Sequence, residues 1–218
     1  MPSKDATLKQ RAERVQAITP ILQRLYPDAR CRLDYRTPLE LLVATVLSAQ
    51  CTDDRVNVVT RDLFRKYPDA HAYAAARQSD LEKDIRPTGT FRRKAQMLRA
   101  IAAELVNRHG GQVPADMAAL TALPGVGRKS ANVVLGNAFG MNEGIVVDRH
   151  VARVSARLGL TRHTDPVKIE QDLMKIVPRD MWTRFAHLLI FHSRAVCNAR
   201  KPKCDQCELR PHCPTGRG

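Results

Sequence analysis

The chain carries a glycine-rich turn, Leu123-Pro124-Gly125-Val126-Gly127-Arg128-Lys129, directly before a stretch with helical spacing. Glycines at 125 and 127 can adopt positive φ at little cost, so the backbone can turn sharply and expose its N–H groups. The following apolar residues recur at the period of a helix: Ala131, Val134, Leu135 and Ala138. Because a helix N-terminus attracts anions, the turn from Gly125 to Arg128 is predicted to bind phosphate.

Lys129 lies in the first turn of that helix and off its apolar stripe. The positive end of the helix dipole disfavours a cation there, which favours a neutral amine able to act as a nucleophile. The same residues also fit a solvated lysine beside an ordinary glycine turn. Lys129 is therefore a candidate nucleophile that needs a second signal.

The segment Val147-Asp148-Arg149-His150 supplies that signal. A turn of the form L-P-G-V-G-R-K-[ST]-A followed by V-D-x-H resembles the helix-hairpin-helix DNA glycosylases, and most closely their endonuclease III branch. The resemblance extends over essentially the whole chain. It implies that Lys129 is the catalytic nucleophile, that Asp148 is its catalytic partner and that His150 contacts phosphate. On its position alone, Asp148 also fits a plain N-cap of a helix starting at Arg149.

The segment Leu47-Ser48-Ala49-Gln50-Cys51-Thr52-Asp53 matches the L-S-A-Q-x-T-D of the same family. The resemblance implies that Gln50 fills the gap left by an extruded base and that Ser48 lines the base pocket. Family members usually place a bulky apolar wedge, often leucine, where this chain has Thr90. A threonine inserts less apolar surface between bases, so we expect a weaker wedge at this position.

Four cysteines spaced C-x6-C-x2-C-x5-C form a candidate metal site: Cys197, Cys204, Cys207 and Cys213. Thiolates alone in one short loop suit a [4Fe-4S] cluster or an all-cysteine zinc site, and two disulfides are the third alternative. The uneven spacing favours iron-sulfur, because zinc ribbons usually split their cysteines into two close pairs. The resemblance implies a [4Fe-4S] cluster, which the family carries on this spacing. Cys31 and Cys51 are interpreted as buried small side chains.

The net charge of +14, from 36 Lys and Arg against 22 Asp and Glu, favours a polyanionic partner. Arg200, Lys201 and Lys203 stand between the first two cysteines of the metal site, where we expect them to bind phosphate. Neither a signal peptide nor a membrane-spanning run is visible. We therefore expect a soluble monomer, cytoplasmic or nucleoid-associated, whose partner is double-stranded DNA containing a damaged base or an abasic site.

Helical patterns cover nearly the whole chain and strand patterns are absent, which predicts an all-α protein. Residues 38–47 are apolar nearly all round, as in a helix buried on every side. A long helix is expected from Phe91 to about His109, and the last from about Arg179 to Val196. The resemblance implies a two-lobed helix-hairpin-helix DNA glycosylase fold. Residues 31–141 would form a six-helix lobe, and 1–30 would join 142–218 in the iron-sulfur cluster lobe.

The resemblance implies a bifunctional DNA glycosylase and abasic-site lyase of base excision repair that removes oxidised pyrimidines. Lys129 would attack C1′ of an extruded nucleotide and cut the strand on its 3′ side through a Schiff base. A mismatch or alkyl-base glycosylase of the same superfamily is an alternative, as is a non-catalytic helix-hairpin-helix DNA-binding module. The adenine-mismatch branch fits poorly, because it has glutamate at the position of Thr45 and lacks the lysine.

Overall fold

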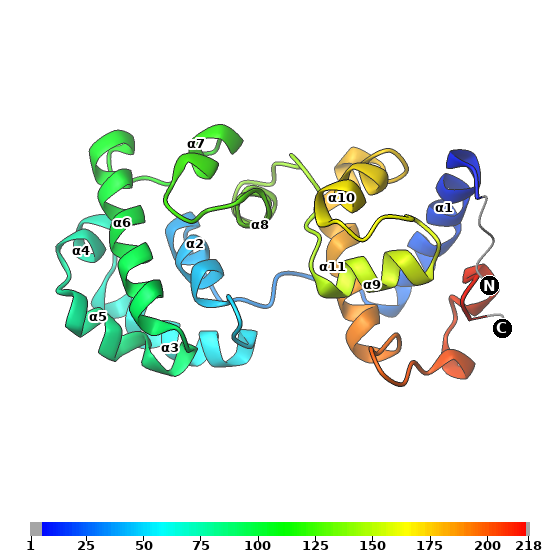
Figure 1. The fold of residues 1–218 in the computed structure, drawn as a ribbon, viewed down its shortest axis with the longest axis horizontal. Coiled ribbons are helices and arrows are strands. Elements are labelled where there is room, and N and C mark those ends of the chain that lie inside the picture. The colour runs from blue at the N-terminus through cyan, green and yellow to red at the C-terminus, as the bar shows by residue number, and fades with distance from the viewer. Residues whose placement is uncertain (1–5, 217–218) are drawn as a thin grey trace. The chain divides into compact units, whose positions relative to one another are not determined.

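The computed structural model describes residues 6–216, and within that range all regular elements are helices, as Figure 1 shows. This confirms the predicted all-α class. The chain divides into two compact units, of which one is Cys31–Glu143 and the other joins the part up to Arg30 to the part from Gly144. The boundary expected after residue 141 lies in the loop that follows α8. None of the helices among residues 6–216 has the length and apolar character needed to cross a bilayer.

The continuous unit contains α2 to α8 and a short 3-10 turn. Their bounds are α2 Pro38–Leu47, α3 Asp53–Lys66, α4 Ala70–Ala75, α5 Gln78–Ile85, the 3-10 turn Arg86–Thr88, α6 Phe91–His109, α7 Met117–Ala122 and α8 Arg128–Ala138. Helix α2 is buried along most of its length and packs against α3, α6 and α8. The prediction of a helix enclosed on all sides is confirmed. This central helix supports the glycine turn through α8 and leads directly into Ser48.

Helix α6 has the predicted bounds, because its apolar stripe and its stop signal are both local. Gly110 adopts the left-handed conformation with φ of 58°, and the N–H of Gly111 returns to the Leu105 carbonyl at 2.9 Å. The inward stripe faces α4 and α5 and includes one charged residue, Lys94, which is 4% exposed. A lysine on the buried face of an amphipathic helix is uncommon.

The discontinuous unit is built on α11, which packs against α9 and α1. Its elements are α1 Leu8–Leu25, α9 Arg149–Arg157, α10 Pro166–Met174, the 3-10 turn Arg179–Met181, α11 Trp182–Ala195, and the 3-10 turns Cys204–Gln206 and Arg210–His212. The last helix was expected to start near Arg179, but residues Arg179–Met181 form a 3-10 turn and the α-helix begins at Trp182. A tightened first turn of this kind is common at helix N-termini.

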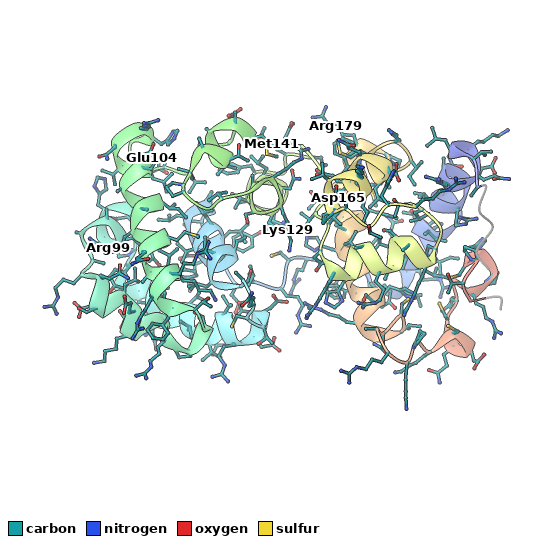
Figure 2. The ribbon with its side chains drawn as sticks, viewed as in Figure 1. Arg99, Glu104, Lys129, Met141, Asp165 and Arg179 are labelled. Carbon is teal, nitrogen blue, oxygen red and sulfur yellow. The ribbon has the colours of Figure 1, made fainter. Side chains whose placement is uncertain are left out.

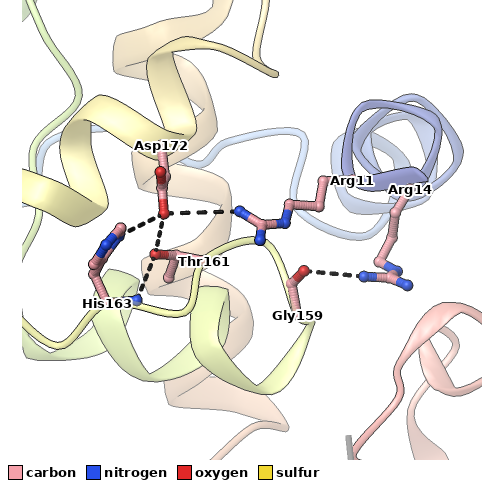
Figure 3. A network of polar contacts seen from close by, with 6 residues as sticks. All are labelled: Arg11, Arg14, Gly159, Thr161, His163 and Asp172. Carbon is pink, nitrogen blue, oxygen red and sulfur yellow. Dashed lines mark hydrogen bonds and ion pairs between the residues drawn. The ribbon is translucent and has the colours of Figure 1, made fainter. Parts of the chain in front are cut away.

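A polar network attaches α1 to the C-terminal part of the chain (Figure 3). The Asp172 carboxylate accepts a hydrogen bond from the Thr161 hydroxyl at 2.7 Å and lies 2.9 Å from His163 Nδ1 and 3.8 Å from an Arg11 guanidinium nitrogen. Burial opposes its ionisation, but the bonds from Thr161 and His163 and the Arg11 charge lower the pKa of Asp172. Nearby, Arg14 donates to the Gly159 carbonyl at 3.1 Å. These contacts explain how segments distant in sequence form one unit.

Candidate active site and nucleic-acid interface

The glycine turn joins α7 to α8 as the sequence predicts, with one difference between its two glycines. Gly125 has φ of 71°, and a Cβ there would lie 2.4 Å from Met97 Cε, so a side chain is disfavoured by both backbone and packing. Gly127 has φ of −87° and is the N-cap of α8, so the positive φ expected for it is wrong. Because Gly127 has no side chain, no N-cap side chain accepts a hydrogen bond from the first N–H groups of α8.

Lys129 lies in the first turn of α8 and its side chain is exposed, as labelled in Figure 2. Arg128 is also exposed, and its guanidinium donates to the Glu143 carbonyl at 3.2 Å. Val126, by contrast, is only 3% exposed and packs into the core of the unit. A contact of Val126 with DNA can therefore involve its backbone but not its side chain.

Ser48 and Gln50 follow the end of α2. The Ser48 hydroxyl donates to the Thr45 carbonyl at 2.8 Å, and the Cys51 N–H closes a turn onto the Ser48 carbonyl at 3.1 Å. Gln50 is exposed and sits inside this turn with φ of 55°, in the left-handed region. The turn therefore presents the Gln50 side chain outward from the end of the central helix.

Thr90 is exposed and has φ of 43°, immediately before α6. Among residues 6–216, Gln50 and Thr90 are the only non-glycine residues with positive φ. Such a conformation costs roughly 1 kcal/mol or more and is a clear outlier for a β-branched residue. Both positions that the resemblance assigns to insertion into the duplex therefore carry backbone strain. Strain of this kind persists only where surrounding contacts hold the backbone in place.

Asp148 belongs to the discontinuous unit, whereas Lys129 belongs to the continuous one. Asp148 is half-buried and caps α9, its Oδ1 accepting hydrogen bonds from the N–H groups of His150 at 2.7 Å and Val151 at 2.8 Å. The N-cap interpretation is therefore confirmed. Two bonds to the same oxygen also fix the orientation of the carboxylate.

His150 is held by two residues that the sequence reasoning missed, Ser193 and Arg153. Its Nδ1 lies 2.9 Å from the Ser193 hydroxyl, to which Arg153 also donates, and 3.4 Å from the Arg153 guanidinium. Because Arg153 donates to the hydroxyl, the hydroxyl proton is available to Nδ1, which then acts as an acceptor. Burial, together with the neighbouring arginines and against the effect of Asp148, lowers the pKa of His150. The neutral ring then carries its proton on Nε2, as a donor.

The four cysteines predicted to bind metal line one cavity, together with His192 and Arg157. All four are half-buried free thiols, which excludes the two disulfides from this structure. Burial is the largest cause that raises the pKa of Cys207; a backbone hydrogen bond at Leu209 lowers it, and the charges of Cys213, Cys197 and Cys204 raise it further. No group of three or more Cys, His, Asp or Glu side chains within residues 6–216 is arranged as a complete metal site.

Arg157, a residue that the sequence reasoning missed, connects α9 to the cysteine loop. Its guanidinium lies 3.3 Å from Cys197 Sγ and donates to the carbonyls of Asn198 at 2.7 Å and Ala199 at 3.0 Å. Its own carbonyl lies 3.4 Å from Cys213 Sγ. A fixed cation beside the thiols and a shared apolar cavity are compatible with an anionic thiolate-bound cluster.

Arg200, Lys201 and Lys203 lie in the loop that follows Cys197, and all three side chains are exposed. The Lys203 N–H returns to the Val196 carbonyl at 3.0 Å, which closes the loop at its base. These three side chains thus project from a segment that is anchored at both ends.

Residues 43–179 match the model of the HhH-GPD superfamily of base excision DNA repair proteins. Endonuclease III of Synechocystis sp. (strain ATCC 27184 / PCC 6803 / Kazusa) is 51% identical over 98% of this chain and 96% of the relative. A trapped covalent intermediate of an endonuclease III with DNA superposes with a TM-score of 0.90 at 44% identity over 98% of both chains. A thermostable thymine-DNA glycosylase superposes with a TM-score of 0.83 at 28% identity, over 98% of this chain and 99% of the other. This chain belongs to the endonuclease III family of helix-hairpin-helix base excision DNA repair proteins.

Proposed function

We propose that the protein removes oxidised pyrimidines from double-stranded DNA and cleaves the resulting abasic site, with Lys129 as the nucleophile and Asp148 as its catalytic partner. As a member of the endonuclease III family it is a DNA glycosylase and abasic-site lyase. The observation that carries the assignment to Lys129 is its exposed position in the first turn of α8, directly after the uncapped glycine turn.

The proposed reaction begins when the damaged nucleotide leaves the base stack. The neutral Lys129 amine forms a bond to C1′, the glycosidic bond breaks, and its electron pair leaves with the base, which takes up a proton. The C1′–O4′ bond then breaks, O4′ takes up the proton that the nitrogen has given up, and the resulting Schiff base acidifies the C2′ protons. Loss of one of them expels the 3′ phosphate by β-elimination, and water then releases the amine. The Asp148 carboxylate stabilises positive charge at the sugar during base departure and assists the proton transfers.

DNA is the proposed partner of both units, bound by a monomer in the cytoplasm or nucleoid. In the continuous unit, backbone N–H groups from Gly125 to Arg128 would contact phosphate at the start of α8. Gln50 and Thr90 would enter the duplex, and Ser48 would border the base pocket. In the discontinuous unit, phosphates would be bound by the Nε2–H of His150 and by the side chains of Arg200, Lys201 and Lys203.

A [4Fe-4S] cluster held by Cys197, Cys204, Cys207 and Cys213 is the proposed cofactor. The support is that all four thiols line one cavity, together with His192, whose Nε2 lies 3.6 Å from Cys207 Sγ, and with the Arg157 guanidinium beside Cys197. When bound, the cluster cross-links the C-terminal loop and takes no part in the bond-breaking steps. The loop between Cys197 and Cys204 would then hold the side chains of Arg200, Lys201 and Lys203 toward the DNA backbone.

The proposed substrate range is tested with duplexes that each contain one defined lesion. We expect release of oxidised pyrimidines such as thymine glycol, followed by cleavage 3′ to the lesion, and a covalent adduct on reduction with borohydride. The similarity to a thymine-DNA glycosylase makes a G·T mismatch the matched comparison substrate. Excision of mismatched thymine without oxidised bases would assign the mismatch function, and absence of any adduct would assign a DNA-binding module.

The role of Asp148 is tested by Asp148→Asn, which keeps an N-cap side chain and removes its charge. We expect the melting temperature to change little and base excision to slow by roughly two orders of magnitude or more. Asp165, labelled in Figure 2, provides the matched control Asp165→Asn, because it caps α10 by accepting a hydrogen bond from the Lys168 N–H at 3.0 Å. Single-turnover rates close to wild type in Asp148→Asn would reduce Asp148 to a structural cap.

A further inference from the structure

Lys94 is a buried cation without an anionic partner among the described residues. It is 4% exposed, and its Nζ donates to the carbonyls of Leu47 and Thr88, each at 2.7 Å. Burial lowers the pKa of Lys94, while the charge of Cys51 acts in the opposite direction. The side chain also starts in the first turn of α6, where the helix dipole disfavours a cation. The two carbonyl bonds are therefore what retains this ammonium in the core.

The two carbonyls belong to the ends of two separate elements. Leu47 is the last residue of α2, and Thr88 is the last residue of the 3-10 turn Arg86–Thr88. Carbonyls at a helix C-terminus lack a partner inside the helix, and a buried one is costly to leave unpaired. A cation is also the favoured partner at the negative end of a helix dipole. The Lys94 ammonium group thus provides a hydrogen-bond donor for the last carbonyl of both elements.

The C-terminal end of each of these two elements is followed within three residues by one of the two residues with positive φ. Gln50 follows Leu47 closely, Thr90 follows Thr88, and no other non-glycine residue among residues 6–216 has positive φ. The backbone N–H of Lys94 also donates to the Thr90 carbonyl at 3.1 Å. Lys94 therefore bonds backbone groups next to both of the residues that carry backbone strain.

We propose that Lys94 is a positioning residue that fixes the segment of Gln50 relative to the segment of Thr90, so that both enter the duplex together. This inference rests on the proposed function, in which these two side chains occupy the opened base stack. Lys94 itself touches neither DNA nor the reacting atoms. Its removal should therefore impair opening of the duplex and leave the chemistry of Lys129 in place.

The test compares Lys94→Met, which keeps a long side chain and removes the ammonium, with Lys83→Met. Lys83 is exposed in the last turn of α5, so this control removes the same charge without touching either carbonyl. Each protein is assayed on a duplex with a paired thymine glycol and on a duplex with a preformed abasic site. A 2-aminopurine base next to the lesion reports unstacking by its fluorescence.

For Lys94→Met we expect excision of thymine glycol to slow by about tenfold to a hundredfold, the size of effect typical of misplaced positioning groups. The fluorescence rise should slow in parallel, whereas borohydride trapping on the abasic duplex should stay within about twofold of wild type. Lys83→Met should match wild type on both duplexes. Lys94→Gln, which keeps one donor group, should fall between wild type and Lys94→Met.

Equal slowing on both duplexes, or none on either, would overturn the positioning role of Lys94. Loss of the folded protein in both Lys94→Met and Lys94→Gln would also overturn it, since Lys94 would then serve the fold alone. Failure of the proposed function gives a different result, because wild-type protein would then neither excise thymine glycol nor form an adduct.

Discussion

Replacement of Lys129 by glutamine is expected to abolish the covalent adduct that borohydride traps on abasic DNA. An amide nitrogen has no available lone pair and cannot form a Schiff base, so both strand cleavage and trapping should be lost. Affinity for the DNA should change little, because the glycine turn, His150 and the loop around Lys201 are all retained. A denaturing gel measures the adduct, and fluorescence anisotropy on an uncleavable abasic analogue measures the affinity.

Two further variants separate the nucleophile from its charge. Lys129→Arg keeps a cation in the first turn of α8 but should trap as little as Lys129→Gln. Arg128→Gln removes the neighbouring exposed charge and should trap at full yield while binding DNA more weakly. A normal adduct yield in Lys129→Gln would place the nucleophile at another amine of the chain.

Those features of the fold that depend on neighbouring residues were predicted from the sequence. Helices α2 and α6 have their expected bounds, since apolar patterning and the glycine stop signal at Gly110 are both local. The turn at Gly125 was predicted for the same reason. Gly127 was assigned the wrong φ, because an N-cap in extended conformation and a left-handed turn both accept glycine.

The residues that the sequence reasoning missed act through contacts between distant segments. Lys94 reaches a carbonyl 47 residues away, and Arg157 bonds the cysteine loop about 40 residues away. The sequence does contain a signal for Lys94, because this residue interrupts the apolar stripe that includes Ala95 and Leu98. Arg157 left none, since an arginine at a helix end is ordinary. Periodicity therefore indicates where a buried charge lies but not which groups it bonds.

Replacement of Cys204 by serine is expected to prevent recovery of soluble, folded protein. The chain from Cys197 to Gly216 contains two 3-10 turns as its only regular elements, and Leu209 is its only buried apolar side chain. So little buried apolar surface offsets little of the entropy of ordering the loop, and in the proposed assignment metal ligation supplies the difference. Loss of one thiolate ligand removes that contribution and releases Arg200, Lys201 and Lys203 from their anchored presentation.

Wild-type protein should accordingly be yellow-brown and contain about four irons per chain without stoichiometric zinc. Metal analysis and the visible spectrum measure both properties. Cys31→Ser is the matched control, because Cys31 is a half-buried thiol in the continuous unit, outside the cysteine cavity. This variant should keep its colour, its iron and its glycosylase activity. A Cys204→Ser protein that is soluble, colourless and fully active would show that the C-terminal loop folds on protein contacts alone, and the four cysteines would then have no cofactor to hold.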